Sequence, residues 1–569
     1  MKTRSWFPPL LAGLSHAALM IAAFPPYNLW PAALWALVPL VYLLRRGSER
    51  PGRDALLLML GVSPMWLLWE WWMIGVTAPG FPFFILLQCS WAALFYLTSA
   101  RLHRRFPRLP LLAIVPLVWV AVEFFRGEIF LSGYAFGLLG YPMIGQLELA
   151  GPATWLGVYF VSFLAAVMSA AAGEFFHKQH RLAAVSTIAA TAMVWGAGAV
   201  DAEKYKPQPT DPVVRPGIVQ TNLPQNNKLS WGIERSLQDW DRFAQLTVTL
   251  ANSDPRPDFI LWPETMMPGE TLEAQAMQAL REAAIGFRLP SGQMLPAEFF
   301  YEELQALQLA VKVPMLVGED ALLDLRVDKL PDGRINVEWG ARYNSAYLVM
   351  GGEVQPARFD KVRLTPFGET MPFINRWPWL QNQLLAFGAK GMKFDLAAGT
   401  DLTVFEVAGA ATGNTARIVT PICFETTVGD LCRDMVFEKG HRRANLIANL
   451  TNDGWFMNSD LARAQHLQIA QWRCVELATP MARAANTGIS CLSDALGGVT
   501  ARGVEGTRQT AQLDGILRGE VALGTRTTLF ARVGNIFPWT ILGVATLALL
   551  ASFVRTKQPR IADGPKADH

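Results

Sequence analysis

Charged residues and cysteines are scarce in this sequence of 569 residues. Asp, Glu, Lys and Arg make up 17% of the chain, whereas soluble proteins carry about 25%. The five cysteines lack close pairing, which excludes a disulfide scaffold and a zinc ribbon. The net charge of +3 is too small to favour nucleic acid as a partner. Together with 51% apolar residues, these absences indicate a membrane component.

The shortage of charge is confined to the first part of the chain. Residues 1–200 hold 20 charged residues, or 10%, and the remaining 369 hold 77, or 21%. Two differently solvated parts therefore share one polypeptide. At about 150 residues per soluble domain, the second part has room for one large domain or two modest ones.

Eight stretches are apolar and long enough to cross the bilayer, for which a helix needs about 20 residues. Seven lie within 1–205 and the eighth within 526–555, followed by a tail at 556–569. We therefore expect eight transmembrane helices, at 7–23, 28–44, 55–76, 82–100, 110–126, 153–175, 182–200 and 530–553.

The loops between these stretches predict their orientation. Basic residues cluster in alternate loops, at 45–53, 101–108 and 178–181, and near both ends of the chain. Loops rich in Lys and Arg stay cytoplasmic. We therefore expect both termini in the cytoplasm and the polar block 212–525 outside it.

Three charged residues accompany the apolar stretches. Glu70, Glu123 and Arg126 lie at or near the expected outer ends of spans, and a charge within the membrane is a functional candidate. The plainer interpretation is that they are interfacial residues, with Glu123 and Arg126 paired at i,i+3.

The polar block alternates short apolar runs with segments of helical periodicity, which indicates an α/β fold. Expected strands are Asp258–Trp262, Pro314–Val317, Ala346–Met350, Arg417–Ile422 and Asn445–Leu450, and expected helices are Leu272–Ala284, Glu302–Val311 and Leu461–Leu477.

Two segments of this block depart from the alternation. Residues 285–300 are typical of a surface insertion. Phe373–Lys393 is rich in Trp and Leu, which fits a loop that enters the lipid interface. Packing of this loop against the domain's own core is an equal alternative.

Three residue types in the block together suggest acyl-transfer chemistry. Cys423 follows an expected strand, Glu264 ends another, and Lys361 lies in a segment ending in Pro-Phe-Gly-Glu. Singly, each is ordinary: most cysteines are core residues, and most Glu and Lys are solvated. Jointly, a desolvated carboxylate can deprotonate a thiol, and an ammonium can stabilise an oxyanion.

The other chemically notable residues have plain interpretations. Cys432, Cys474 and Cys491 lack metal-ligand spacing, and we expect core thiols. His466, on a helical segment, is expected to pack or to form hydrogen bonds.

These elements, in this order, resemble the Glu–Lys–Cys triad of the nitrilase superfamily. The membrane segments narrow the resemblance to the apolipoprotein N-acyltransferase family. The matching pieces are Trp262-Pro263-Glu264, Asp360-Lys361 with Pro366-Phe367-Gly368-Glu369, Ile422-Cys423-Phe424-Glu425, Phe24-Pro25-Pro26, Gln220–Gln225, Tyr343-Asn344-Ser345, Asn452–Phe456 with Gln465-His466, and Arg483–Gly488.

The resemblance implies a fold and a set of residue roles. The fold is an αββα sandwich joined to an eight-helix transmembrane bundle. Glu264 would be the general base, Lys361 the oxyanion-stabilising cation and Cys423 the nucleophile. The resemblance adds five residues: Glu369 and Glu425 as further active-site carboxylates, Phe424 where the family often has Tyr, and Trp231 and Asn344 in substrate binding.

The resemblance also implies substrates and a location. The acyl donor would be a phospholipid, commonly phosphatidylethanolamine, and the acceptor the α-amino group of a diacylglyceryl-modified apolipoprotein. We expect a monomer in the bacterial inner membrane, with the catalytic domain in the periplasm and both termini cytoplasmic. We expect no cofactor and no metal.

Two other functions compete with this interpretation. A membrane-anchored nitrilase-type amidase could use the same triad on a small substrate, although one short anchor would suffice for it. A transporter or scaffold with an inert domain would carry charged or broken helices at the midplane of the membrane, which the sequence does not indicate.

Overall fold

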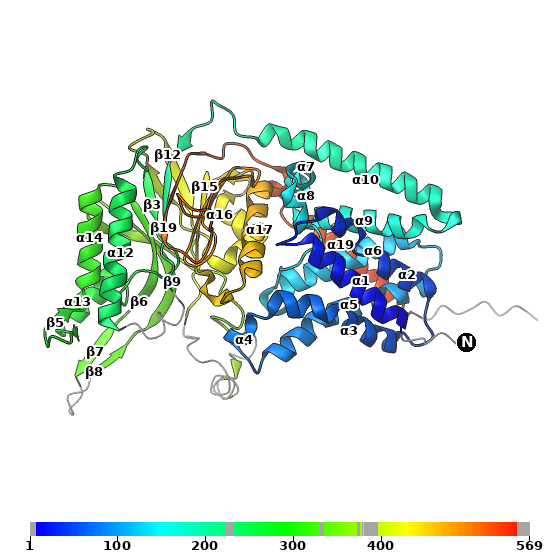
Figure 1. Ribbon diagram of the computed structural model, residues 1–569, viewed down its shortest axis with the longest axis horizontal. Coiled ribbons are helices and arrows are strands. Elements are labelled where there is room, and N and C mark those ends of the chain that lie inside the picture. Colours follow the sequence, from blue (N-terminus) through cyan, green and yellow to red (C-terminus); the bar gives the residue numbers. More distant parts are fainter. Residues whose placement is uncertain are drawn as a thin grey trace, which may run out of the picture.

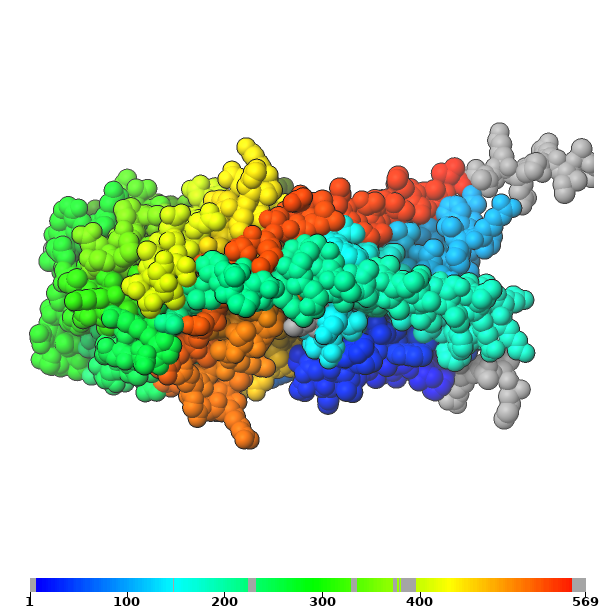
Figure 2. Space-filling model, turned by 90° about the horizontal axis from the view of Figure 1, so that it is seen from above, coloured from blue at the N-terminus to red at the C-terminus, as the bar shows by residue number. Residues whose placement is uncertain are grey.

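The computed structural model describes residues 7–223, 232–329, 335–371, 376–377, 379 and 396–554. Figure 1 shows two parts side by side, a layered sheet sandwich and a bundle of helices. In Figure 2, seen from above, the two parts form one elongated body.

Two six-stranded sheets form the sandwich. The first has the order β10-β9-β6-β3-β2-β19 and the second β11-β12-β15-β16-β17-β18. Strands β2, β3 and β6 run parallel, as do β12, β15 and β16, and the other pairings within the two sheets are antiparallel. The strands are β2 Pro216–Gln220, β3 Phe259–Leu261, β6 Met315–Leu323, β9 Ala341–Met350, β10 Glu353–Asp360, β11 Phe405–Ala408, β12 Thr415–Val419, β15 Leu446–Thr451, β16 Met481–Ala485, β17 Cys491–Ser493, β18 Val499–Arg502 and β19 Gly515–Arg518.

Alternation of side chains along the strands explains why the two sheets pack on each other and are also covered by helices on their outer faces. In β3, Phe259 and Leu261 enter the core between the two sheets, while Ile260 and the following Trp262 enter the core on the outer face. Successive strand residues point to opposite faces, so an apolar strand buries both. Helices α12 (Ile233–Ala251) and α14 (Phe299–Val311) cover the outer face (Figure 1). Helices α16 (Gly429–Val436) and α17 (Asp460–Leu477) cover the second sheet.

The structure confirms the αββα sandwich. All five predicted strands and all three predicted helices of this part are present, with ends shifted by a few residues. The predicted Leu272–Ala284 helix is α13 (Ala274–Glu282). The insertion expected at 285–300 contains a hairpin of β4 (Gly286–Arg288) and β5 (Met294–Pro296), largely on the surface. Smaller pairs are β1 (Val213–Val214) with β20 (Val521–Ala522), β7 (Arg326–Lys329) with β8 (Ile335–Glu338), and β13 (Phe437–Glu438) with β14 (His441–Arg442).

Each of the eight apolar stretches contributes helix to the bundle. The longer helices pack in the pairs α1–α3, α3–α5, α6–α9, α9–α10 and α6–α19. They are α1 Phe7–Ala23, α2 Val38–Arg46, α3 Pro51–Glu70, α5 Phe81–Arg105, α6 Leu111–Phe124, α9 Val158–Phe175, α10 Arg181–Ala202 and α19 Ile536–Ala551. By length and composition, the segments Phe81–Arg105, Val158–Phe175 and Lys178–Tyr205 suffice to cross a membrane, and Phe7–Ala23 and Ile536–Ala551 are shorter apolar helices.

Several expected spans are interrupted rather than continuous. Residues 28–44 divide into a 3-10 turn, η1 (Trp30–Trp35), and α2, in which Pro39 occupies the first turn. Proline lacks an N–H and is tolerated best in the first turn of a helix, although Pro64 and Pro116 lie inside α3 and α6. The stretch 153–175 divides into α8 (Ala153–Leu156) and α9 at Gly157, whose φ is +78°. Short elements α4 (Met73–Val76) and α18 (Leu529–Val533) lie beside α3 and α19.

Glu70, Glu123 and Arg126 are buried within the protein rather than exposed at the ends of their helices. These three residues are only 1%, 3% and 5% exposed, respectively. Arg126 donates to the carbonyl of Phe136 at 2.6 Å, and Glu123 accepts from the Leu139 N–H at 2.7 Å. These partners, in place of the expected i,i+3 pair, come from a loop that folds back into the bundle, which helical spacing alone does not predict.

Helix α17 joins the two parts of the protein, and Figure 1 shows it between the second sheet and the bundle. One face, with Ile469, Trp472 and Val475, enters the core of the helical bundle. The other face, including Cys474 and Leu477, enters the core of the sandwich. A helix that is apolar on both sides must be covered on both, so the sandwich and the bundle share one continuous packed boundary.

Close packing of α1 on α3 yields a testable prediction about stability. A Cβ on Gly61 would lie 2.6 Å from the carbonyl oxygen of Leu10, so Gly61→Ala forces the two backbones apart. We expect the substitution to lower the free energy of unfolding by about 1–3 kcal/mol, measured as a reduced thermal unfolding midpoint in detergent.

Gly196→Ala on α10 is the matched control, because nothing lies within 4 Å of its Cβ position. Alanine favours helix over glycine by up to about 1 kcal/mol, so this variant should be as stable as the unchanged protein or more so. Equal midpoints for both variants would contradict the close approach of α1 and α3.

Candidate active site

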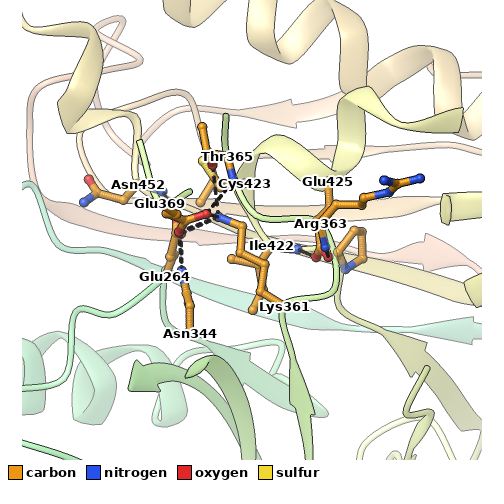
Figure 3. A network of polar contacts seen from close by, with 12 residues as sticks. Glu264, Asn344, Lys361, Arg363, Thr365, Glu369, Ile422, Cys423, Glu425 and Asn452 are labelled. Atoms are coloured by element: carbon orange, nitrogen blue, oxygen red, sulfur yellow. Dashed lines mark hydrogen bonds and ion pairs between the residues drawn. The ribbon is translucent and has the colours of Figure 1, made fainter. Parts of the chain in front are cut away.

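The candidate residues come from strand ends of both sheets. Glu264 follows β3, Cys423 follows β12, and Asn452 follows β15. The carboxyl ends of parallel strands meet at one edge of a sheet, where loops are free to hold ligands. Figure 3 shows Glu264, Lys361 and Cys423 gathered in one place, with Asn344 and Glu369 beside them.

The Glu264 carboxylate accepts hydrogen bonds from both halves of the sandwich. Oε1 accepts from Asn344 Nδ2 at 2.7 Å and from Lys361 Nζ at 3.3 Å. Oε2 accepts from the backbone N–H of Asn452 at 2.8 Å. Glu264 is 5% exposed. Its carboxylate is therefore fixed in position and largely removed from water.

Lys361 is a buried cation between two carboxylates. Its side chain is 1% exposed, and Nζ lies 3.3 Å from Glu264 and 2.8 Å from Glu369. Burial alone would lower the pKa of Lys361, but the charges of Glu369 and Glu264 outweigh it and raise the pKa above its usual value. The ammonium is therefore charged at neutral pH.

Glu369 supports this cation. Burial favours a higher pKa for Glu369, but the Lys361 charge and hydrogen bonds hold the pKa below its usual value. Its Oε2 accepts from the Thr365 N–H at 2.8 Å, and its Oε1 accepts from Asn344 Nδ2 at 3.1 Å. One amide group, that of Asn344, thus contacts both carboxylates that face Lys361.

Cys423 occupies a strained turn. Its φ is +49°, in the left-handed region that side-chain-bearing residues rarely adopt, and it begins the 3-10 helix η8 (Cys423–Thr427). Burial and then the Glu264 charge raise the pKa of the thiol, while Lys361 lowers it. The thiol is therefore protonated at rest and needs a base to become a nucleophile.

Glu425 links the lysine segment to the cysteine turn. Its Oε1 accepts from the N–H groups of Val362 and Arg363, at 2.7 and 2.9 Å, and its Oε2 accepts from the Ile422 N–H at 2.7 Å. Burial raises the pKa of Glu425 to about 7, and these N–H bonds and the Lys361 charge oppose the rise. One carboxylate thus binds the residues next to Lys361 and to Cys423.

The remaining predicted site residues have different outcomes. The Phe424 side chain is buried in the apolar core that the two sheets share with α16 and α17. Trp231 lies outside the described residues. So does most of Phe373–Lys393, although Trp377 and Trp379 are 61% and 73% exposed. Cys432, Cys474 and Cys491 are buried, as predicted.

Sequence reasoning missed the backbone contributions to the site. The N–H groups of Asn452, Val362 and Arg363 carry no side-chain signature, so only the adjoining motifs could have pointed to them. Thr365, whose hydroxyl lies 3.4 Å from Lys361 Nζ, was visible inside the motif that ends at Glu369. Among the described residues, no group of three or more His, Cys, Asp or Glu side chains is placed to hold a metal ion.

Comparison with known families covers both parts of the chain. Residues 218–521 match the carbon-nitrogen hydrolase family. Residues 16–171 match the family described as the N-terminal domain of apolipoprotein N-acyltransferase. The first match spans the candidate site, and the second spans most of the helical bundle.

Relatives of similar length match almost the whole chain. The chain is 28% identical to an apolipoprotein N-acyltransferase of Azotobacter vinelandii, covering 100% of this chain and 99% of the relative. It is 27% identical to one of Geobacter metallireducens, with 95% of each chain covered. A solved amidase structure from Nesterenkonia sp. AN1 is 12% identical, with a TM-score of 0.33, covering 58% of this chain and 97% of that one.

The three bonds to Glu425 predict a local effect of its removal. Glu425→Ala leaves the Ile422, Val362 and Arg363 N–H groups without their acceptor, and an unsatisfied buried donor costs about 1–3 kcal/mol. We expect a lower unfolding midpoint and faster hydrogen exchange at 361–364 and 421–424, measured by mass spectrometry.

Glu425→Gln is the comparison variant, because its single amide oxygen can still accept from Val362 and Arg363. Exchange at 361–364 should then stay slow, while exchange near Ile422 increases. Unchanged exchange at both segments in Glu425→Ala would contradict the link.

Proposed function

The chain belongs to the carbon-nitrogen hydrolase family, and on this basis we propose that it is a membrane-bound N-acyltransferase acting on lipoproteins. It would transfer an acyl chain from a phospholipid to the α-amino group of a diacylglyceryl-modified apolipoprotein. The observation that most supports this proposal is the buried contact of Lys361 with Glu264 beside Cys423, on a chain that also matches the N-terminal domain of the acyltransferase family.

In the first step, Glu264 removes the proton from the Cys423 thiol. The thiolate attacks the ester carbonyl of the phospholipid, and the charged Lys361 stabilises the oxyanion that forms. When the C–O bond breaks, Glu264 returns the proton to the leaving lysophospholipid. An acyl thioester remains on Cys423.

In the second step, the amine of the lipoprotein attacks the thioester carbonyl. Glu264 accepts the proton of the amine, the C–S bond breaks, and the proton passes to the thiolate as the amide forms. Covalent catalysis of this kind lets one pocket receive the two substrates in turn. Exclusion of water from the buried site favours transfer over hydrolysis of the thioester.

The remaining site residues have supporting roles in this proposal. Asn344 orients Glu264 through its 2.7 Å hydrogen bond, and Glu369 holds the Lys361 ammonium. Glu425 fixes the turn of Cys423. Phe424 contributes packing beside the nucleophile, and we assign Trp231 to the wall of the substrate pocket.

The helical part has a physical purpose in this scheme. Moving an acyl chain out of the bilayer costs about 0.8 kcal/mol for each CH₂ group, so an enzyme that uses phospholipid gains by placing its site next to the membrane. We propose eight spans in the bacterial inner membrane, with 212–525 in the periplasm, both termini in the cytoplasm, and a monomeric enzyme that uses phosphatidylethanolamine as its donor.

The proposed thioester predicts a covalent intermediate. When the purified protein is incubated with phospholipid carrying a labelled acyl chain, and no acceptor, we expect the label on Cys423, sensitive to hydroxylamine and absent from Cys423→Ala. Intact mass and peptide mapping measure it. Cells that contain the protein should also convert diacyl lipoproteins to triacyl forms.

Cys89→Ala is the matched control, because this cysteine is buried on α5 in the helical bundle, and this variant should keep the label on Cys423. Triacylation by the Cys423→Ala variant would contradict the assignment. Hydrolysis of a small amide by a protein that never takes up the acyl label would favour the membrane-anchored amidase instead.

The proposed orientation predicts where reagents reach the chain. A cysteine introduced at Ser48, between α2 and α3, should stay unlabelled by an impermeant maleimide in spheroplasts until the membrane is opened. One introduced at Ser291, in the exposed β4–β5 hairpin, should react at once. The opposite pattern would place the sandwich in the cytoplasm.

A further inference from the structure

A buried ion-pair cluster lies directly behind the candidate site. Asp453 accepts from Arg483 Nη2 at 3.1 and 3.2 Å and from the Thr451 hydroxyl at 3.1 Å. His466 Nδ1 lies 2.9 Å from Asp453 Oδ1 and 3.1 Å from Arg483 Nη2. The side chains of Asp453 and Arg483 are 0% exposed, and that of His466 is 2% exposed. Buried ion pairs contribute little net stability, so the stability of the sandwich alone does not account for this cluster.

The cluster contacts the segments of both reacting groups. On one side, Asp453 directly follows Asn452, whose N–H donates to Glu264 at 2.8 Å. On the other, Arg483 donates to the Asn449 side-chain oxygen. The Asn449 amide donates at 2.8 Å to the carbonyl of Pro421, two residues before Cys423.

The same cluster contacts the helical bundle through aromatic rings. The His466 ring lies 6.3 Å from the ring of Phe136 and 5.5 Å, edge to face, from that of Phe456. Phe456 in turn packs edge to face on Trp72, just after α3, at 4.8 Å. The carbonyl of Phe136 itself accepts the hydrogen bond from Arg126.

The space around the carboxylate fits Asp453 closely. A Cβ on Gly488 would lie 1.9 Å from its Oδ2, so the backbone at 488 approaches the carboxylate too closely for any other residue. A longer side chain at 453 would meet the same backbone. The position of the carboxylate is therefore determined from several sides at once.

We propose that Asp453 is a positioning residue, which holds Glu264 and Cys423 in a fixed geometry relative to each other. Asp453 also links both residues to the membrane helices through His466 and Phe456. Among the described residues, Asp453 forms no hydrogen bond to Glu264, Lys361 or Cys423, and it acts on the Cys423 thiol directly only through its charge, which raises the pKa of that thiol. It acts through the Asn452 N–H and through Arg483 and Asn449. This inference rests on the proposed function, because its effect is on the acylation of Cys423.

The test compares Asp453→Asn with Asp258→Asn in the full-length protein. Asp258 is an equally buried carboxylate, 1% exposed, which precedes β3 and binds the N–H groups of Arg215, Ala411 and Thr412. It therefore lies at the opposite end of the strand that Glu264 follows. The measurement is the single-turnover rate of acyl transfer from labelled phospholipid to Cys423, per folded molecule and over a range of phospholipid concentrations.

For Asp453→Asn we expect a loss of about 100-fold in the maximal rate, the size that small displacements of reacting groups produce, with an unchanged half-saturating phospholipid concentration. Asp258→Asn should lower the unfolding midpoint and keep its rate. Equal rates for the two variants, or a loss confined to phospholipid affinity, would overturn the inference.

His466 provides a second pair of variants if Asp453→Asn does not fold. His466→Asn keeps a polar group toward Asp453 and Arg483, whereas His466→Phe keeps a ring and loses the polar contact. We expect the Phe variant to lose most of the acylation rate and the Asn variant to keep it. Equal rates would show that the hydrogen bond to Asp453 does not position the site.

Trp72→Ala tests the link to the membrane helices. Its effect on the acylation rate should be smaller in the Asp453→Asn background than in the unchanged protein, because the path to Glu264 is already broken. Additive effects would overturn this part. An unchanged protein that forms no acyl-Cys423 would instead refute the proposed function, which is a different result from two variants with equal rates.

Discussion

The hydrogen bonds to Glu264 are the constraint on which the site depends. Its carboxylate accepts hydrogen bonds from the Asn344 and Lys361 side chains of the first sheet and from the backbone N–H of Asn452 of the second. Apolar packing between the two sheets is non-directional, and polar contacts such as those of Glu425 and Asp258 add to it. A shared carboxylate adds the direction that packing lacks, so the residues from distant parts of the chain meet in one geometry.

The charges of the site are arranged so that Lys361 stays positively charged while the Cys423 thiol stays neutral. Two carboxylates surround Lys361 and keep it protonated, while burial and the Glu264 charge hold the Cys423 thiol in its protonated form. A protonated thiol is a weak nucleophile and also a poor target for oxidation. We therefore expect the Cys423 thiol to become reactive only when a bound substrate changes these surroundings.

The sequence predicted well what depends on local pattern and poorly what depends on distant neighbours. Short apolar strands, and the motifs around Glu264, Lys361 and Cys423, are local signals, and the structure brings these three residues together. The burial of Glu123 and Arg126 depends on a loop that returns from residues 133–140, and no periodicity reports such a contact. The breaks before α2 and at Gly157 were not predicted, although Pro39 and Gly157 are visible in the sequence, because both stretches are apolar throughout.

The two-sided packing of α17 limits how such an enzyme can change in evolution. A relative that lost its membrane helices would expose Ile469, Trp472 and Val475 to water, an apolar face of the kind that makes proteins aggregate. The apolar face of α17, together with Phe456 against Trp72, is thus the surface that a change between aqueous and membrane-bound forms of this sandwich would have to alter.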